Sequence, residues 1–170
     1  MVTETVVILL GSDLEPRKEF IASAVSLLQQ QVGILTKESG MYESEPWGFE
    51  SDTRFLNKVV VLESELQARE VLKNCLDIEQ ALGRERKKGS GYASRTIDVD
   101  ILYFGQKVLD EEDLQIPHPR LQERRFTLLP LREVLPGFLH PVLKKTQKEL
   151  LEQCSDRSQV VLFKEKEDAL

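Results

Sequence analysis

The sequence predicts an α+β fold: a ferredoxin-like βαββαβ core with a mainly antiparallel sheet flanked by helices, followed by an extra hairpin and C-terminal helices. Compact apolar runs of strand length alternate with longer amphipathic segments in the order that this core requires. Loops that contain glycine and proline separate them. The 170 residues are enough for one domain with a substantial core. We expect that domain over residues 1–163, with a frayed tail over 164–170.

The N-terminal segment is predicted to form a strand and a helix. Val6–Leu10 is a compact apolar strand that ends at Gly11. Ser12 or Asp13 is then placed to cap a helix over Pro16–Gln31, because both residue types accept hydrogen bonds from a first helical turn. The buried stripe predicted for this helix consists of Phe20, Ala24, Leu27 and Leu28.

The next segments supply two strands and a second helix. Ile34–Tyr42 is predicted as a strand, and a loop with the letters SEPWGFESDTR separates it from a clear strand over Phe55–Glu63. Leu66–Leu82 has the period of an amphipathic helix, and Gly83 is its stop. The apolar side of that helix is formed by Val71, Leu72, Cys75, Ile78 and Leu82.

The last strand of the core is ASRTIDVDILYF, read from Ala93. Strand alternation turns one set of side chains to one face, namely Ile97, Val99, Ile101 and Tyr103, and the other set to the opposite face, namely Thr96, Asp98, Asp100 and Leu102. After it we expect a hairpin of Ile101–Phe104 with Lys107–Leu109, the turn IPHPR, and helices over Gln122–Leu135 and Leu143–Gln153.

The aspartates at alternate positions of an apolar strand raise a question of charge. Asp98 and Asp100 are about 6.5–7 Å apart along the chain, and like charges at that spacing repel unless a cation pairs with them. A solvated edge strand without function would also carry them. Two basic clusters flank the pair: Arg84, Arg86, Lys87, Lys88 and Arg95 before it, and His118, Arg120, Arg124 and Arg125 after it. Together they favour a site for Mg²⁺ and a polyphosphate. GRERKKGSG lacks the Walker A order, so side chains would hold the nucleotide.

Composition limits the classes of function. Hydrophobic residues make up 41% and charged residues 31%, and a net charge of −6 argues against a general nucleic-acid binder. Cys75 and Cys154 lie far apart without metal-ligand spacing, which favours the reducing cytoplasm. The first apolar run is too short for a signal peptide, and no run approaches the length of a membrane span. We expect a cytoplasmic monomer with small-molecule substrates, no nucleic acid and no membrane.

Several motifs in order resemble one family. LLGSDL, YESEPWG, FLNKVV, IEQALGRERK, SRTIDVDILYFG, IPHPRLQERRFTLLPL and PGFLHP occur as they do in the 6-hydroxymethyl-7,8-dihydropterin pyrophosphokinases of folate biosynthesis. The resemblance extends from about Val6 to Pro141. It implies an enzyme that transfers pyrophosphate from ATP to the pterin hydroxymethyl group and releases AMP, with two Mg²⁺ ions and in-line attack on the β-phosphorus.

The resemblance also implies roles for single residues. Asp98 and Asp100 would bind the metal ions and, with Arg84 and Arg95, carry catalysis. The residues implied to bind ATP are Glu79, Arg84, Arg86, Arg95, His118 and Arg124. Phe55 and Phe126 would enclose the pterin ring and Asn57 would read its edge, while Ser44, Glu45 and Trp47 would close over it. His118 is the implied donor to a phosphate, and an ordinary turn residue is the alternative.

Departures from the family pattern occur at the loops. Tyr92 stands where the family usually has a lid tryptophan, Phe55 lacks the hydroxyl of the usual tyrosine, and Glu45 is acidic beside the implied pterin. None of these departures removes a metal ligand. Two other classes remain open: a nucleotidyltransferase, which would release pyrophosphate instead of AMP, and a ligand-sensing module, which would consume no ATP.

Overall fold

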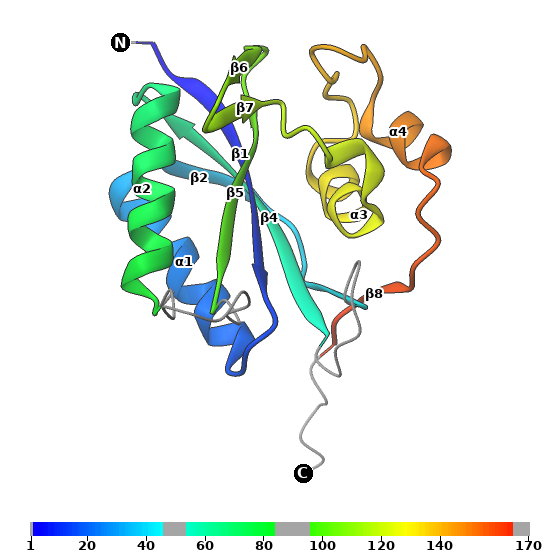
Figure 1. The fold of residues 1–170 in the computed structure, drawn as a ribbon, viewed down its shortest axis with the longest axis horizontal. Helices are drawn as coiled ribbons and strands as arrows, with labels where there is room; N and C mark the ends of the chain where they lie inside the picture. The colour runs from blue at the N-terminus through cyan, green and yellow to red at the C-terminus, as the bar shows by residue number, and fades with distance from the viewer. Residues whose placement is uncertain (1, 46–53, 84–95, 165–170) are drawn as a thin grey trace.

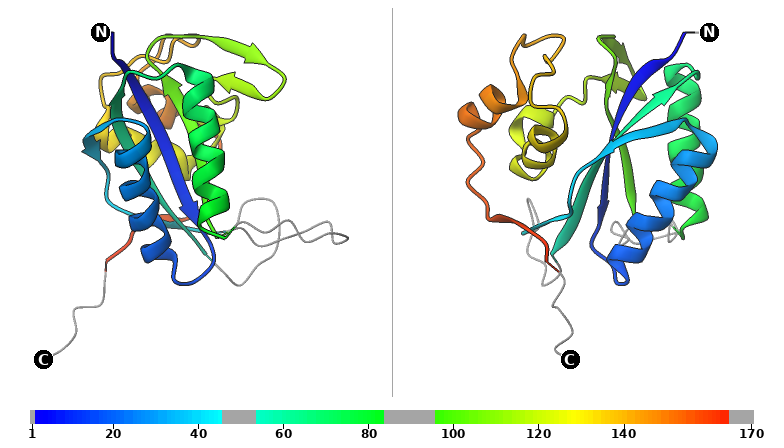
Figure 2. Two further views of the ribbon diagram at one scale, coloured as in Figure 1. Left: turned by 90° about the vertical axis from the view of Figure 1, so that its left-hand side faces the viewer. Right: turned by 180° about the vertical axis from the view of Figure 1, so that it is seen from behind.

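The computed structural model describes residues 2–45, 54–83 and 96–164. A twisted sheet forms the middle layer. Helices α1 (Arg17–Gln31) and α2 (Ala68–Ala81) cover one face of it, and α3 (Arg125–Val134) and α4 (Gln147–Gln153) lie on the other, as both Figure 1 and the view from behind in Figure 2 show. Within the described residues, no helix is long and apolar enough to span a membrane.

The sheet has the strand order β5-β1-β4-β3-β8, and β2 also pairs with β4. Its strands are β1 (Glu4–Ser12), β2 (Ile34–Glu38), β3 (Tyr42–Ser44), β4 (Phe55–Ser64), β5 (Asp98–Phe104) and β8 (Val160–Leu162). All the pairings are antiparallel. The core therefore has the order β5-β1-β4-β2, which is the arrangement of a ferredoxin-like βαββαβ unit, and the predicted fold class is confirmed.

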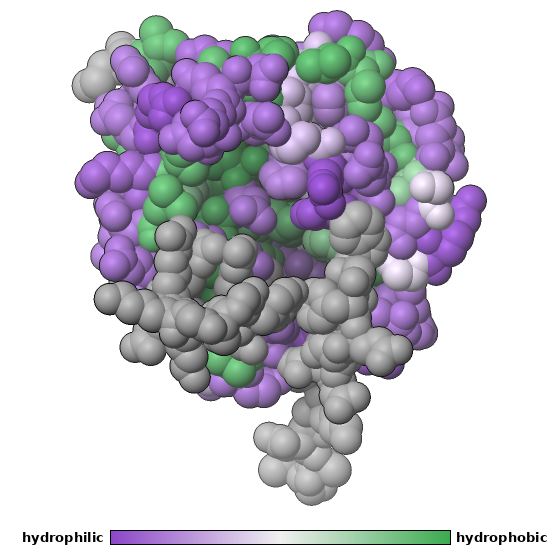
Figure 3. Space-filling view, viewed as in Figure 1, coloured by the Kyte–Doolittle hydropathy of each residue, from purple (hydrophilic) through white to green (hydrophobic). Residues whose placement is uncertain are grey.

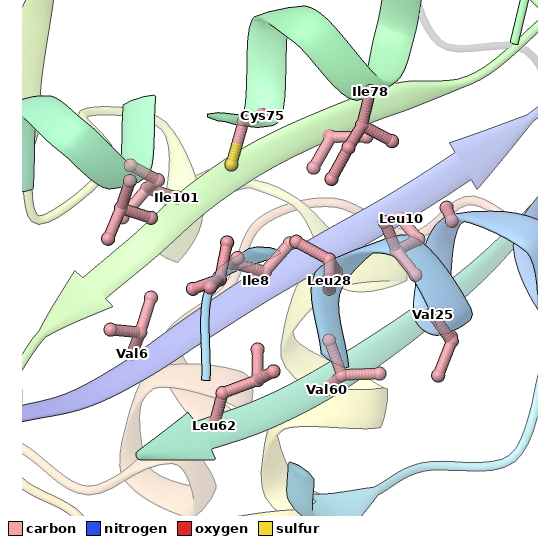
Figure 4. Close-up of a cluster of buried hydrophobic side chains, with 14 of the residues drawn as sticks. Val6, Ile8, Leu10, Val25, Leu28, Val60, Leu62, Cys75, Ile78 and Ile101 are labelled. Carbon is pink, nitrogen blue, oxygen red and sulfur yellow. The ribbon is translucent and has the colours of Figure 1, made fainter. Parts of the chain in front are cut away.

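The central strand β1 is buried on both faces, which explains its uninterrupted apolar run. Val6, Ile8 and Leu10 point into the core under α1 and α2, where Leu28 and Ile78 meet them (Figure 4). The intervening side chains of β1 point into a second core under α3 and α4. Because both faces are covered, β1 needs no polar alternation.

A bulge in β5 corrects part of the predicted alternation. Val7 pairs with Tyr103 but Ile8 pairs with Ile101, so Leu102 is an extra residue in β5. Tyr103 therefore turns to the α3 and α4 face, where its hydroxyl donates to Gln147 Oε1 at 3.0 Å. The prediction that Tyr103 shares the face of Ile101 is wrong. The bulge lies after the aspartates, so their predicted face is unaffected.

The predicted strand Ile34–Tyr42 is divided into β2 and β3. Ser39 interrupts it: its hydroxyl accepts a hydrogen bond from the Val59 N–H at 2.9 Å, in place of a backbone carbonyl. The next residue, Gly40, contacts α3, because its backbone N–H donates to Glu133 Oε2 at 2.9 Å. Glu133 Oε1 also accepts from the Tyr42 hydroxyl at 2.7 Å. A contact from a distant helix thus divides the strand.

Neither predicted cap begins α1. Pro16 is its N-cap residue, with no side-chain cap, while the Ser12 hydroxyl donates to the Thr96 carbonyl at 2.6 Å instead. The buried stripe also differs from the predicted one in part: Ile21, Ala24, Val25 and Leu28 are buried, and Phe20 and Leu27 are partly buried against the same core.

The hairpin and the C-terminal helices also differ from the predicted boundaries. The hairpin is formed by β6 (Leu109–Glu111) and β7 (Leu114–Ile116), because Phe104 belongs to the ladder with β1. A 3-10 turn (Leu121–Glu123) and an extended Arg124 precede α3. Likewise α4 begins only after Thr146, whose hydroxyl caps it by accepting from Glu149 N. The short strand β8 was not predicted.

Candidate active site

A pocket opens between the sheet and the start of α3, at the end of the second core. Figure 3 views the molecule from the same direction as Figure 1, and above the grey atoms it shows hydrophobic side chains between hydrophilic ones. Neighbouring strands β5, β1, β4 and β3 supply most of its wall, and α3 the remainder. It is lined by Leu9, Gly11, Ser44, Glu45, Phe55, Asn57, Asp98, Asp100, Arg124 and Phe126.

Register explains why these side chains meet. Gly11 pairs with Asp98 on one side and with Asn57 on the other, so three neighbouring strands place these residues in one row. Leu9 pairs with Asp100 in the same way. Because residues two apart share a face, both aspartates point to the α3 side, as the alternation predicted. The pocket thus has a carboxylate end, formed by Asp98, Asp100 and Arg124, and an aromatic end, formed by Ser44, Phe55, Asn57 and Phe126.

A side chain of α2 binds the strand that carries the two aspartates of the carboxylate end. Asp98 and Asp100 are half-buried, and between them the Val99 N–H, on the outer edge of β5, donates to Glu79 Oε2 at 2.9 Å. Glu79 itself is buried. This bond fixes the backbone between the two carboxylates. Glu79 is not among the described residues that line the pocket, and its expected place near the nucleotide stays a prediction.

Arg124 brings a positive charge to the same end. Burial lowers the pKa of Arg124, and the nearby carboxylates of Asp100 and Asp98 act in the opposite direction, which is the expected effect of neighbouring opposite charges. Its guanidinium also lies over the ring of Phe126, 5.6 Å from the ring centre. Arg124 therefore connects the two ends of the pocket.

His118 lies beside the carboxylate end but not in the pocket wall. Its Nδ1 accepts a hydrogen bond from Arg120 N at 3.2 Å, which leaves Nε2 as the donor of the neutral ring. Burial first, and then the charges of Arg124 and Arg120, lower the pKa of His118 to about 4. At neutral pH this imidazole is a hydrogen-bond donor without charge, which suits a phosphate contact and not general-base catalysis.

The aromatic end is built around a buried amide. Asn57 Nδ2 donates to the Ser44 hydroxyl at 3.0 Å, and both residues are buried. Gly11 leaves the room for this amide, because a Cβ at position 11 would lie 2.9 Å from Asn57 Oδ1. Phe55, two residues before Asn57, shares its face. The amide is thus held in one orientation beside an aromatic ring, as recognition of a flat polar ring requires.

The structure brings together most of the described residues that the sequence singled out. Asp98, Asp100, Arg124, Ser44, Glu45, Phe55, Asn57 and Phe126 all line the pocket, whereas Glu79 and His118 do not. Glu79 instead binds the backbone of β5, and His118 is close enough to Arg124 for that charge to lower its pKa. The predictions for Trp47, Arg84, Arg86 and Arg95 lie outside the described residues, as do those for Lys87, Lys88 and Tyr92.

Sequence reasoning missed two residues of the pocket wall, Leu9 and Gly11, and one acidic neighbour of Asp98, Asp13. Gly11 was expected to end the first strand, but β1 continues to Ser12 and Gly11 lies within the pocket wall. Asp13 lies close to Asp98. Burial raises the pKa of Asp13, and the negative charge of the nearby Asp98 raises it further. The only sequence signal was the small pair Gly11–Ser12 directly after an apolar strand, which ordinary strand ends also show.

The carboxylate end suits hard divalent cations. Among the described residues no group of three or more His, Cys, Asp and Glu side chains is placed to hold a metal ion. Two carboxylates are nevertheless enough protein ligands for Mg²⁺ when phosphate oxygens and water complete its coordination shell. Paired carboxylates, an arginine and an adjoining aromatic pocket are the combination of groups expected in an enzyme that transfers phosphoryl groups to a ring-bearing acceptor.

Comparison with known proteins narrows that class. The model of the 7,8-dihydro-6-hydroxymethylpterin-pyrophosphokinase (HPPK) family matches residues 7–136. A 2-amino-4-hydroxy-6-hydroxymethyldihydropteridine pyrophosphokinase of Porphyromonas gingivalis is 43% identical over 134 residues, 78% of this chain and 90% of that protein. The protein of the same name from Bacillus subtilis is 36% identical over 160 residues, 94% of this chain and 90% of that protein. The chain belongs to the HPPK family, and it is an enzyme of the pyrophosphokinase type.

Solved structures agree on the fold. The chain resembles a Plasmodium falciparum HPPK-DHPS, crystallised with pteroate, with a TM-score of 0.74 and 16% sequence identity. The similarity covers 89% of this chain and 44% of that longer chain. At this identity the likeness concerns the fold alone.

Proposed function

We propose that this enzyme transfers the pyrophosphoryl group of ATP to the hydroxymethyl group of 6-hydroxymethyl-7,8-dihydropterin and releases AMP. The observation that carries the proposal is the continuity of the pocket. One row of the sheet leads from Asp98 through Gly11 to Asn57, so a polyphosphate at the carboxylate end and a ring at the aromatic end would meet above Gly11.

The carboxylate end would take the nucleotide. Asp98 and Asp100 would hold two Mg²⁺ ions, which neutralise triphosphate charge and orient its oxygens when bound. Arg124 adds a guanidinium within the pocket, and His118 offers its Nε2–H at the border. The residues proposed for ATP from the family resemblance alone are Arg84, Arg86 and Arg95, with Arg84 and Arg95 acting in catalysis. Glu79 would support this end indirectly, through the Val99 backbone.

The aromatic end would take the pterin. Phe55 and Phe126 come from different layers of the fold and line the same pocket, so a flat ring between them would contact both. Asn57 offers its amide oxygen and one N–H to the ring edge, since its other N–H already donates to Ser44. Glu45 lies at the rim, and Trp47 keeps its proposed role on the strength of the resemblance.

The proposed reaction is an in-line displacement. The hydroxymethyl oxygen attacks the β-phosphorus, the bond from that phosphorus to the oxygen shared with the α-phosphorus breaks, and AMP leaves with that oxygen. The hydroxyl proton passes to solvent, since the low pKa of His118 makes this ring a poor base. Positioning and charge neutralisation supply most of the acceleration in such transfers.

Product analysis tests the proposal. The purified chain is incubated with ATP, Mg²⁺ and the hydroxymethyl pterin, and the nucleotides are separated by chromatography. AMP in equal amount to a pterin diphosphate is the expected result. Pyrophosphate with an adenylylated pterin would indicate a nucleotidyltransferase, and unchanged ATP would indicate a binding module.

A further inference from the structure

Arg17, at the start of α1, lies directly behind the aromatic end of the pocket. Its Nε contacts Glu15 Oε1 at 2.6 Å, and its Nη1 donates both to Glu43 Oε2 at 3.0 Å and to the Arg54 carbonyl at 2.9 Å. Only 14% of the side chain is exposed. A guanidinium so enclosed loses less to solvent screening than a surface ion pair.

Two of the partners of Arg17 are chain neighbours of pocket residues. Glu43 precedes Ser44 in β3, and Arg54 precedes Phe55 in β4. Ser44 and Phe55 face each other across the two strands. Because side chains alternate along β3, Ser44 points to Asn57 in the pocket while Glu43 points to α1. The Arg17 guanidinium therefore links β3 to the start of β4 next to the paired residues Ser44 and Phe55.

The C-terminal segment completes this support. The ring of Phe163 lies 5.8 Å from the Arg17 guanidinium carbon, and Phe163 N donates to the Met41 carbonyl at 2.8 Å, just before β3. Strand β8 pairs with β3 along its other edge. With only three residues, β3 has few ladder bonds of its own, so its position depends on these flanking contacts.

We infer that Arg17 is a positioning residue for the acceptor: it fixes β3 against β4 and thereby sets the distance between Ser44, Asn57 and Phe55. The inference rests on the proposed function, in which these side chains bind the pterin. Arg17 points away from the pocket and touches no substrate. Its loss leaves the carboxylate end, which belongs to β5 and α3, in place.

The test compares the two substrates in Arg17→Ala. Calorimetry measures the Kd of the hydroxymethyl pterin in the presence of a non-hydrolysable ATP analogue and Mg²⁺, and separately the Kd of that analogue. We expect the pterin Kd to rise about tenfold and the nucleotide Kd to change less than about twofold, with the same split in KM. The pterin Kd of Arg17→Lys should lie between those of the wild type and Arg17→Ala, because an ammonium keeps the positive charge but lacks the planar arrangement of N–H donors of a guanidinium.

Arg69→Ala is the matched control. Arg69 also binds two carboxylates, Glu111 at 2.6 Å and Asp113 at 2.9 Å, but at the start of α2 and in the β6–β7 hairpin, which do not line the pocket. It should leave both affinities unchanged. If Arg17→Ala fails to fold, Arg17→Lys and Glu43→Gln are measured in its place, with a selective loss of pterin affinity expected for both.

Two results would overturn the inference: pterin affinity equal to that of the wild type in the Arg17 variants, or an equal loss for pterin and nucleotide, which indicates a general structural role. The wild-type titration separates these from a failure of the proposed function. Wild-type protein that binds no pterin would overturn the function and this role together, whereas wild-type binding that persists in Arg17→Ala would overturn this role alone.

Discussion

Gly11→Ala tests the pocket geometry with the smallest possible change. The new Cβ would lie 2.9 Å from Asn57 Oδ1, which is closer than real Cβ atoms approach another heavy atom, so the structure must shift. Asn57 has little freedom to retreat, because it is 2% exposed and its amide nitrogen donates to Ser44 at 3.0 Å. Either the amide rotates and that bond is lost, or β1 and β4 move apart.

The loss of stability in Gly11→Ala depends on which of these two changes occurs. Loss of a buried hydrogen bond costs about 0.5–1.5 kcal/mol, and overpacking by one methyl group in a close-packed site costs about 1–3 kcal/mol. Because the displaced amide is the proposed reader of the ring edge, we expect pterin affinity to fall about tenfold to a hundredfold, at about 1.4 kcal/mol for each factor of ten. Nucleotide affinity should change much less, since the aspartates belong to the other neighbouring strand.

Calorimetry with pterin in the presence of Mg²⁺ and an ATP analogue measures the effect, and urea unfolding measures stability alongside. Gly137→Ala is the control, because a Cβ at position 137 meets no atom within 4 Å. It should bind pterin like the wild type. Wild-type pterin affinity in Gly11→Ala would show that Asn57 does not read the pterin, and the assignment of the aromatic end would have to be abandoned.

Three further predictions concern single residues. Asp98→Asn and Asp100→Asn should each lose most turnover while circular dichroism and the unfolding midpoint remain close to the wild type, and near-normal activity in both would exclude the metal role. Folding lowers the pKa of His118 to about 4, whereas in the unfolded chain this histidine has its ordinary pKa of roughly 6.5. At pH values between these two, the unfolded chain therefore binds more protons than the folded protein. Stability from this group is therefore complete above the ordinary pKa and is lost as the pH falls towards 4, so His118→Asn should remove on the order of 1–2 kcal/mol of the acid sensitivity measured by urea unfolding; an unchanged pH profile would contradict it. Phe126→Ala should weaken pterin binding by more than the roughly 0.5–1.5 kcal/mol of a ring contact alone, because burial is lost as well, and unaltered pterin binding by calorimetry would place the ring elsewhere.

Local patterns predicted the parts of the site that lie on one strand. Alternation was enough to place Asp98 and Asp100 on one face, and Phe55 with Asn57 on another strand, because a strand has only two sides. Which strands are neighbours follows from the βαββαβ order, and that order was visible in the apolar runs. The carboxylate and aromatic ends could therefore be predicted separately.

Contacts between distant residues explain most of what could not be predicted. The break between β2 and β3 depends on Glu133, a residue of α3 far along the chain, and the bulge at Leu102 depends on how β5 pairs with β1. The function of Gly11 appears only when Asn57 lies opposite it. Arg17 shows no motif at all, because its importance comes from partners on three separate segments.

The central claim is that the acceptor oxygen attacks the β-phosphorus of ATP, and the fate of one oxygen atom tests it. ATP is prepared with ¹⁸O in the position that bridges the α- and β-phosphorus, and the products with hydroxymethyl pterin and Mg²⁺ are analysed by mass spectrometry. Attack at the β-phosphorus breaks the bond between that phosphorus and the bridging oxygen, so the label should be recovered in AMP. Recovery of the label in free pyrophosphate, with the adenylyl group on the pterin, would show attack at the α-phosphorus and contradict the account.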